Sequence, residues 1–160
     1  MKCIWKIGLV LTKYYTIKTA IDGSNTASIN YFAFFPTENF YLLAAGTGIT
    51  PMCKLIQSIH KFCKMNKKRR TVTLLNFNKT QKDIIWKNEF KTLEDSKDFT
   101  FKVIHIMSQE DDWNGDKGRV RKEILEKYLP LGKSDFTKFA AICGPIMFNQ
   151  ESNRYVVWPN

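Results

Sequence analysis

One short stretch constrains the fold most, because a buried-strand pattern, a glycine turn and a helical pattern follow one another without interruption. Residues 40–45 form a continuous apolar run, which is typical of a strand that is buried on both faces. Gly46-Thr47-Gly48 comes next. From Pro51 onward the apolar residues recur at helical spacing, and proline is tolerated in the first turn of a helix. This order predicts a strand, a tight glycine turn and an amphipathic helix.

Further strand and helix patterns alternate along the rest of the chain. Strands are predicted over residues 71–77, 99–107 and 139–143, and helices over residues 83–93 and 120–129. Strands that alternate with helices at this spacing imply right-handed crossovers between parallel neighbours. We therefore predict an α/β fold, a doubly wound and mostly parallel sheet with helices on both faces.

Length and composition bound the number of domains. The chain has 160 residues, of which 44% are hydrophobic and 14% aromatic, so it can bury one full core and part of a second. Its composition changes near residue 38, because residues 1–38 hold two apolar patches separated by the turn-forming sequence Asp22-Gly23-Ser24-Asn25. We expect one main domain over residues 39–160, preceded by a segment that forms strands or no stable structure.

The charge balance is strongly basic. There are 25 Lys and Arg against 15 Asp and Glu, a net charge of +10, which suits a nucleic acid, an acidic membrane surface or an acidic protein. The densest run holds Lys64, Lys67, Lys68, Arg69 and Arg70. No aromatic side chains interleave with it, as single-strand binding would require, so nucleic acid is not an expected partner. We interpret the run as a solvated connection, with an acidic partner as the weaker alternative.

The cysteines and the N-terminal apolar stretch argue against a disulfide-rich, metal-binding or membrane-spanning protein. The four cysteines form no CxxC pair, so neither a disulfide framework nor a metal site is expected, and reduced thiols are the default. The apolar stretch over residues 3–11 is far shorter than the roughly 20 residues that span a bilayer. We expect no transmembrane segment.

The positions of the glycine turns indicate a ligand. In parallel sheets of this kind, ligands bind outside the carboxyl ends of the strands, where the strand order reverses. Gly46-Thr47-Gly48 and Gly144-Pro145 both follow predicted strands. Glycine lets the backbone approach a phosphate, and the N-terminus of the following helix favours negative charge. The pattern predicts a pyrophosphate site. A tight turn without a ligand is the alternative explanation of the two glycines, and Pro51 departs from the GxGxxG pattern.

Three segments carry a resemblance to a known family. Residues 41–52 resemble the pyridine-nucleotide turn of ferredoxin reductase-like flavoenzymes, and Cys143-Gly144-Pro145 resembles their terminal CGP motif. Residues 78–86 are similar to the segment that holds the adenosine ribose in cytochrome b5 reductases. The Asp-Ile-Ile-Trp ending of that segment, together with residues 113–118, resembles the family members in which a cytochrome b5 domain and a reductase are fused.

The resemblance implies roles for the residues that match its motifs. The first turn would hold the pyrophosphate and set the nicotinamide against the flavin, through Gly46, Thr47, Gly48, Thr50 and Pro51. The residues beside the nicotinamide would be Cys143, Gly144 and Pro145. Thr50 and Cys143 are the catalytic candidates. They would act by orientation, because hydride moves directly from nicotinamide to flavin.

The resemblance also implies which nucleotide is preferred. The adenosine ribose would face Asn78, Thr80 and Asp83. An acidic Asp83 accepts hydrogen bonds from a free 2′-hydroxyl but repels a 2′-phosphate, so NADH is expected in preference to NADPH. Lys79 and Lys82 flank these residues and keep NADPH as an alternative.

The implied function is that of an NADH-dependent flavoprotein oxidoreductase in the cytoplasm, including the cytosolic face of the endoplasmic reticulum. Hydride would pass from NADH to FAD, and single electrons would then pass to a haem protein such as cytochrome b5. The implied partners are an FAD-binding domain and a cytochrome b5-type haem domain or protein.

The chain also departs from the family pattern. The family's FAD-binding motif, Arg-x-Tyr-(Ser/Thr), does not occur in residues 1–38, where Lys13-Tyr14-Tyr15-Thr16 lacks the arginine. Residues 1–38 are therefore expected to be a remnant of an FAD-binding β domain. Residues 39–160 are expected to be an NAD(P)H-binding domain truncated at its C-terminus. FAD is expected for the full-length enzyme rather than for this chain alone. The alternative function is a catalytically silent nucleotide-binding or interaction fragment.

Overall fold

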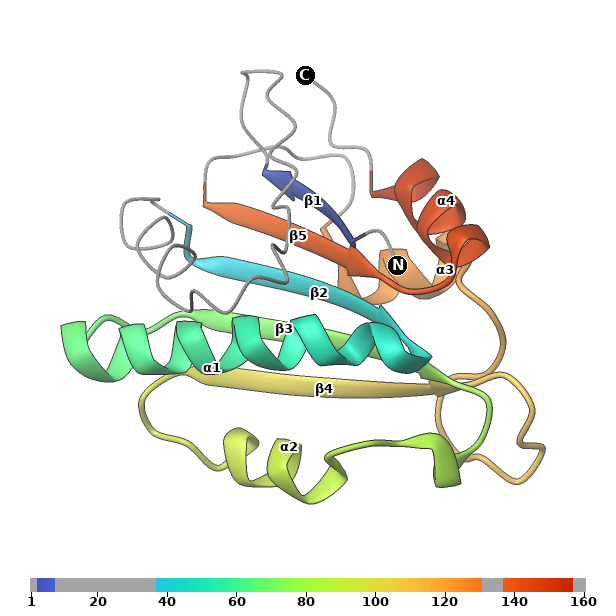
Figure 1. Ribbon diagram of the computed structural model, residues 1–160, viewed down its shortest axis with the longest axis horizontal. Coiled ribbons are helices and arrows are strands. Elements are labelled where there is room, and N and C mark those ends of the chain that lie inside the picture. Colours follow the sequence, from blue (N-terminus) through green and yellow to red (C-terminus); the bar gives the residue numbers. More distant parts are fainter. Residues whose placement is uncertain (1–2, 8–36, 131–136, 157–160) are drawn as a thin grey trace, which may run out of the picture.

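The computed structural model describes residues 3–7, 37–130 and 137–156, and describes the first of these ranges by its backbone alone. A single sheet of five strands has the order β1-β5-β2-β3-β4. The strands are β1 (Cys3–Ile7), β2 (Asn39–Ala45), β3 (Thr71–Asn78), β4 (Thr100–Met107) and β5 (Lys138–Cys143). From β5 to β4 all neighbouring strands are parallel, while β1 pairs with β5 in the antiparallel direction (Figure 1).

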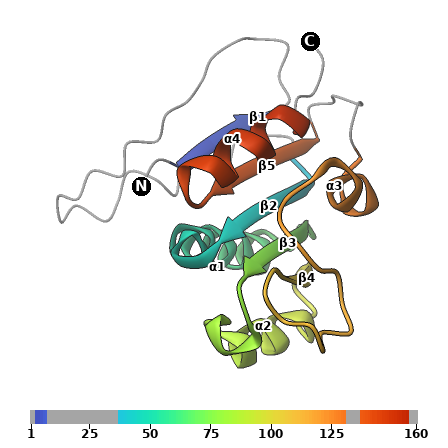
Figure 2. The same ribbon diagram turned by 90° about the vertical axis from the view of Figure 1, so that its right-hand side faces the viewer.

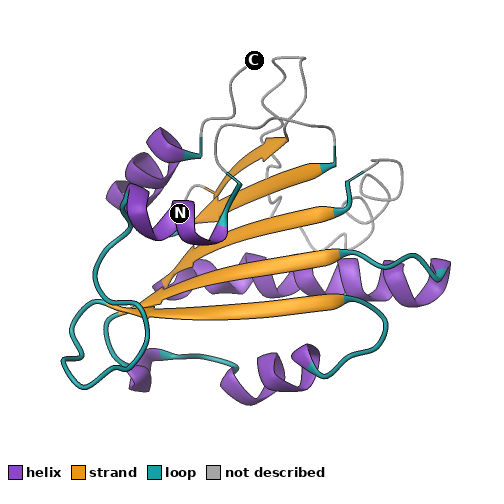
Figure 3. Ribbon diagram, turned by 180° about the vertical axis from the view of Figure 1, so that it is seen from behind, coloured by secondary structure: helices purple, strands orange, loops and turns teal. Residues whose placement is uncertain are grey.

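Helices cover both faces of this sheet, as Figure 3 shows from behind. Helices α1 (Ile49–Asn66) and α2 (Lys87–Glu94) contribute to the core on one face, and α3 (Lys122–Tyr128) and α4 (Ile146–Tyr155) to the core on the other. Two short 3-10 turns, η2 (Gly46–Gly48) and η3 (Gln81–Asp83), follow β2 and β3. The prediction of a doubly wound α/β fold is confirmed.

Each face of the sheet has its own hydrophobic core, because successive strand residues point to opposite faces. On one face, Leu42 belongs to the cluster with Met52 of α1 and Phe90 of α2. On the other, the adjacent Leu43 belongs to the cluster with Leu125 of α3. All of these side chains are buried. Burial on both faces explains why residues 40–45 form an unbroken apolar run.

The order of the strands creates a switch point between β2 and β5. The chain runs outward from β2 to β3 and β4, and then returns to place β5 on the other side of β2. In sheets of this type, ligands bind at such a reversal, outside the carboxyl ends of the two adjacent strands. The fold therefore brings the turns that follow β2 and β5 to one place.

Two helices differ from their predicted form. The helix predicted over residues 83–93 begins only at Lys87, because Trp86 has φ 61°, which interrupts helical geometry, and Gln81–Asp83 forms a separate turn. Helix α4 was not predicted from the pattern. No helix among the described residues is both long and apolar enough to cross a membrane.

The segment before residue 39 contributes one described strand. Sequence patterning predicted either strands or no stable structure there. Strand β1 pairs with β5, with Cys3 opposite Cys143. The turn over residues 22–25 and the sequence Lys13-Tyr14-Tyr15-Thr16 lie outside the described residues. The assignment of residues 1–38 to an FAD-binding domain stays a prediction.

Candidate functional site

The predicted site residues lie at the carboxyl ends of the parallel strands, the edge that faces the viewer in Figure 2. Strand register places Ala45 of β2 opposite Phe77 of β3, and Ala44 opposite Cys143 of β5. The glycine turn after β2 therefore lies between the turn after β3 and the turn after β5. These are the three segments that the sequence analysis selected.

The turns after β2 and β5 meet backbone to backbone. A Cβ atom added to Gly48 would lie 2.0 Å from the carbonyl oxygen of Cys143. A Cβ atom added to Gly144 would lie 2.6 Å from the ring of Phe148 and 2.9 Å from the Cβ of Ala45. Both glycines are needed because the neighbouring atoms leave no room for a side chain. The contact makes one continuous surface from the two turns.

Gly46 has a different role, since it lies in open space. Its φ of 54° is in the left-handed region that favours glycine, and no atom lies within 4 Å of an added Cβ. It is exposed, as are Thr47 and Thr50, while Pro51 is half-buried. Helix α1 begins at Ile49 with no acidic side chain in its first turn, so the positive end of its dipole is not neutralised. An anionic group can approach here.

The turn after β3 is built around Asp83. Its Oδ2 accepts hydrogen bonds from the backbone N–H and the hydroxyl of Thr80, each at 2.9 Å. These two bonds hold the pKa of Asp83 below its ordinary value, so the exposed carboxylate is ionised at neutral pH. Asn78 is buried at the end of β3, and its Nδ2 has no hydrogen-bond partner among the described residues.

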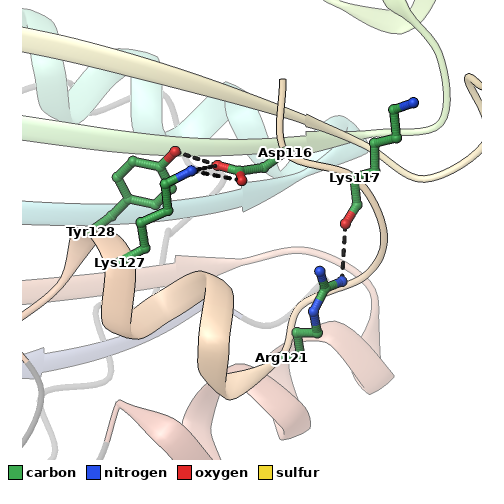
Figure 4. Close-up of polar contacts among 5 residues, drawn as sticks. All are labelled: Asp116, Lys117, Arg121, Lys127 and Tyr128. Atoms are coloured by element: carbon green, nitrogen blue, oxygen red, sulfur yellow. Dashed lines mark hydrogen bonds and ion pairs between the residues drawn. The ribbon is translucent and has the colours of Figure 1, made fainter. Parts of the chain in front are cut away.

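The loop after β4 closes the same edge. Asp116 binds both Lys127, at 2.9 and 3.1 Å, and the hydroxyl of Tyr128 (Figure 4). Arg121 donates a hydrogen bond of 3.0 Å to the carbonyl of Lys117. These contacts tie the loop to the start and end of α3. From the same loop, Glu110 reaches the turn after β3, a contact that the sequence analysis missed.

The turn after β5 contains the second catalytic candidate. Cys143 is fully buried and forms a disulfide, whereas a reduced thiol was expected. Cys53 and Cys63 are free thiols, and burial raises the pKa of Cys53 to about 11. Gly144 is buried and its carbonyl accepts a hydrogen bond of 3.1 Å from Asn149, while Pro145 is exposed at the surface. A buried sulfur in a disulfide is not a nucleophile, and the role of Cys143 in orientation stays a prediction.

The arrangement fits a dinucleotide. The open space at Gly46 and the dipole of α1 suit a pyrophosphate. The ionised Asp83 suits a ribose hydroxyl, and the buried Nδ2 of Asn78 is a donor without a partner among the described residues. The turn at residues 143–145 lies against the glycine turn, where a nicotinamide attached to that pyrophosphate would lie.

The chain is similar in sequence to known proteins. The chain matches the protein family described as an oxidoreductase NAD-binding domain over residues 42–153. It is 38% identical to cytochrome b5 reductase 4 of Rattus norvegicus over 118 residues, which are 73% of this chain and 22% of the rat protein. It is 39% identical to NADH-cytochrome b5 reductase 2 of Aspergillus oryzae over 110 residues, which are 68% of this chain and 32% of the fungal protein.

Two solved structures are also similar to this chain. The CS-b5R domains of human Ncb5or, in the NAD+ form, are 32% identical with a TM-score of 0.64, covering 74% of this chain and 33% of that one. The cytochrome b5 reductase domain of Ulva prolifera nitrate reductase has a TM-score of 0.61 at 22% identity, covering 71% of this chain and 41% of that one, which shows the fold alone.

The parallel sheet and the glycine turn at its switch point agree with the match to an oxidoreductase NAD-binding domain, which defines the class of this chain. The chain belongs to the oxidoreductase NAD-binding domain family and, within it, to the cytochrome b5 reductase type. It spans 22% of the rat relative and 32% of the fungal one.

Proposed function

We propose that this chain is the nucleotide-binding part of an NADH-dependent flavin oxidoreductase. NADH binds at the carboxyl edge of the sheet, hydride passes to FAD, and single electrons then pass to a haem protein such as cytochrome b5. The observation that carries the proposal is the backbone contact between Gly48 and Cys143, because it joins the two turns into one surface at the switch point. The names of the relatives support the reductase class and the use of NADH.

The residues of this chain would bind and orient the nucleotide. Gly46 and Thr47 would receive the pyrophosphate, with the dipole of α1 stabilising its charge. Asp83 would accept a hydrogen bond from a ribose hydroxyl. Thr50 and residues 143–145 would hold the nicotinamide ring in place, and the bound nicotinamide itself supplies the hydride chemistry.

We further propose that a separate FAD-binding domain holds the flavin. The family's Arg-x-Tyr-(Ser/Thr) motif is missing from residues 1–38, so this chain would bind NADH without binding FAD. The haem partner and the location at the cytosolic face of the endoplasmic reticulum rest on the resemblance alone. The alternative is a catalytically silent nucleotide-binding fragment, and the test must distinguish it from the nucleotide-binding part of a working reductase.

The test combines a visible absorption spectrum with a ferricyanide assay. The purified chain is incubated with FAD, desalted and supplied with NADH, with and without a separately produced FAD-binding domain of a cytochrome b5 reductase. We expect a colourless chain that reduces ferricyanide only when the flavin domain is added, beyond the rate of that domain alone. A yellow chain that is active alone would contradict the separate flavin domain. NADH binding without any restored activity would favour the silent fragment.

A further inference from the structure

Two carboxylates converge on the turn that would face the adenosine ribose, and only one of them belongs to the motif found in the sequence. Asp83 accepts the backbone N–H of Thr80 at 2.9 Å. Glu110 accepts the backbone N–H of Gln81 through Oε2, and the side-chain Nε2 of Gln81 through Oε1 at 3.0 Å. The N–H groups of two consecutive residues are therefore each bonded to a carboxylate.

The structure holds Glu110 in this position through the backbone. The segment after β4 runs beside the segment after β3, with the N–H of Ser108 bonded to the carbonyl of Asn78 at 3.0 Å. The N–H of Gln109 is bonded to the carbonyl of Lys79 at 2.9 Å. Glu110 follows directly and is half-buried. Its contact with Gln81 thus continues an ordered backbone pairing rather than a chance meeting of two loops.

We propose that Glu110 is a positioning and specificity residue of the ribose site. Its carboxylate fixes the turn that carries Thr80 and Asp83, and it adds a second negative charge that disfavours a 2′-phosphate. The inference rests on the proposed function, because it assigns a role within the NADH site.

Charges of both signs surround the turn, and their balance decides between NADH and NADPH. Lys79 and Lys82 are exposed there and would attract the 2′-phosphate of NADPH. A 2′-phosphate would instead meet the carboxylates of Asp83 and Glu110, and would find the N–H groups of both turn residues already bonded. A free 2′-hydroxyl carries no charge and can donate a hydrogen bond to a carboxylate. The negative charges of the two carboxylates therefore offset the positive charges of Lys79 and Lys82, which had kept NADPH as an alternative.

The test measures the dissociation constants of NADH and NADPH by calorimetry for the wild type, Glu110→Gln and Glu110→Ala. Glutamine keeps an acceptor for the Gln81 N–H but removes the charge. We expect Glu110→Gln to keep NADH affinity within about twofold and to shift the NADPH-to-NADH affinity ratio about fivefold toward NADPH, as the loss of one partly exposed charge allows. Glu110→Ala should shift the ratio and also weaken NADH.

A matched control removes one charge elsewhere. Glu126 lies on α3, where it pairs with Lys122 at 3.5 Å, and Glu126→Gln should leave both affinities unchanged. An unchanged ratio in both Glu110 variants would overturn the inference while leaving the proposed function intact, as would an equal shift in Glu126→Gln. A wild type that binds neither nucleotide would overturn the proposed function itself and the inference with it.

Discussion

Gly48 is the residue at which the two halves of the candidate site meet. Its backbone has ordinary helical geometry, with φ −62° and ψ −12°, so glycine is not needed there for conformational freedom. It is needed for space, because the Cβ position is occupied by backbone atoms of Cys143, which cannot rotate away. Gly46 shows the opposite case, a left-handed φ with open space around it.

We predict that Gly48→Ala separates the turns after β2 and β5. Overpacking of this kind costs about 1–3 kcal/mol of folding stability, and NADH binding should be lost because the two turns no longer form one surface. Gly46→Ala is the matched comparison, since it introduces left-handed strain of about 1–2 kcal/mol without a clash. Thermal melting and NADH calorimetry measure both effects. A Gly48→Ala variant with wild-type stability and affinity would contradict the close contact.

Motif residues of the site could be predicted from the sequence, but Glu110 could not. The glycine turn and residues 143–145 follow strands whose apolar pattern is clear, so their common edge follows from the topology. Glu110 lies in a polar stretch with no periodicity. Its contact with Gln81 joins residues far apart in sequence, and only the register of β3 with β4 brings them together.

At the scale of elements, two helices differ from prediction, and each difference has a physical cause. Helix α4 carries its apolar Ile146 and Met147 at the surface, while Asn149 and Ser152 are buried, so it lacks the apolar stripe that identifies a helix in sequence. Helix α2 starts late because Trp86 takes a left-handed conformation, which helix propensities do not predict. The strands were predicted well because both of their faces are buried.

The loop after β4 depends on Asp116. Hydrogen bonds from Tyr128 and Lys127 hold the pKa of Asp116 below its ordinary value of 3.8. A carboxyl group whose pKa is lower in the folded state stabilises the fold at pH values above its unfolded pKa, and this contribution disappears as the pH falls through the lowered value. The loop should therefore be fully anchored at neutral pH and should loosen only in acid below about pH 4.

We predict that Asp116→Asn lowers the free energy of unfolding at pH 7 by about 1 kcal/mol, because the charged acceptor shared by Lys127 and Tyr128 is lost. The variant should also lose less stability than the wild type as the pH falls through the acid range. Melting curves between pH 3 and pH 7, a range set around the ordinary carboxyl pKa, give both quantities. Asp112→Asn, which removes an exposed acid from the same loop, should leave both unchanged. Equal behaviour of the two variants would contradict the anchoring role.

At the scale of the whole molecule, the fold gathers one site from segments far apart in the sequence. Alternating strand and helix patterns were enough to predict the parallel sheet, because each crossover has one favoured hand. They could not predict the pairing of β1 with β5, since an antiparallel edge strand leaves no local signal of its partner. The nucleotide site depends on the parallel strands, and so it could be located without knowing β1.

The central claim is that NADH binds between the turns after β2 and β5, and a charge placed at Gly46 tests it directly. Aspartate and asparagine both tolerate the left-handed φ of 54°, and the open space there accepts either side chain. NADH calorimetry on the wild type, Gly46→Asn and Gly46→Asp separates the charge from the shape. We predict that Gly46→Asp binds NADH roughly tenfold more weakly than Gly46→Asn, because its carboxylate repels the pyrophosphate. Equal NADH affinity in all three proteins would place the nucleotide elsewhere and contradict the account.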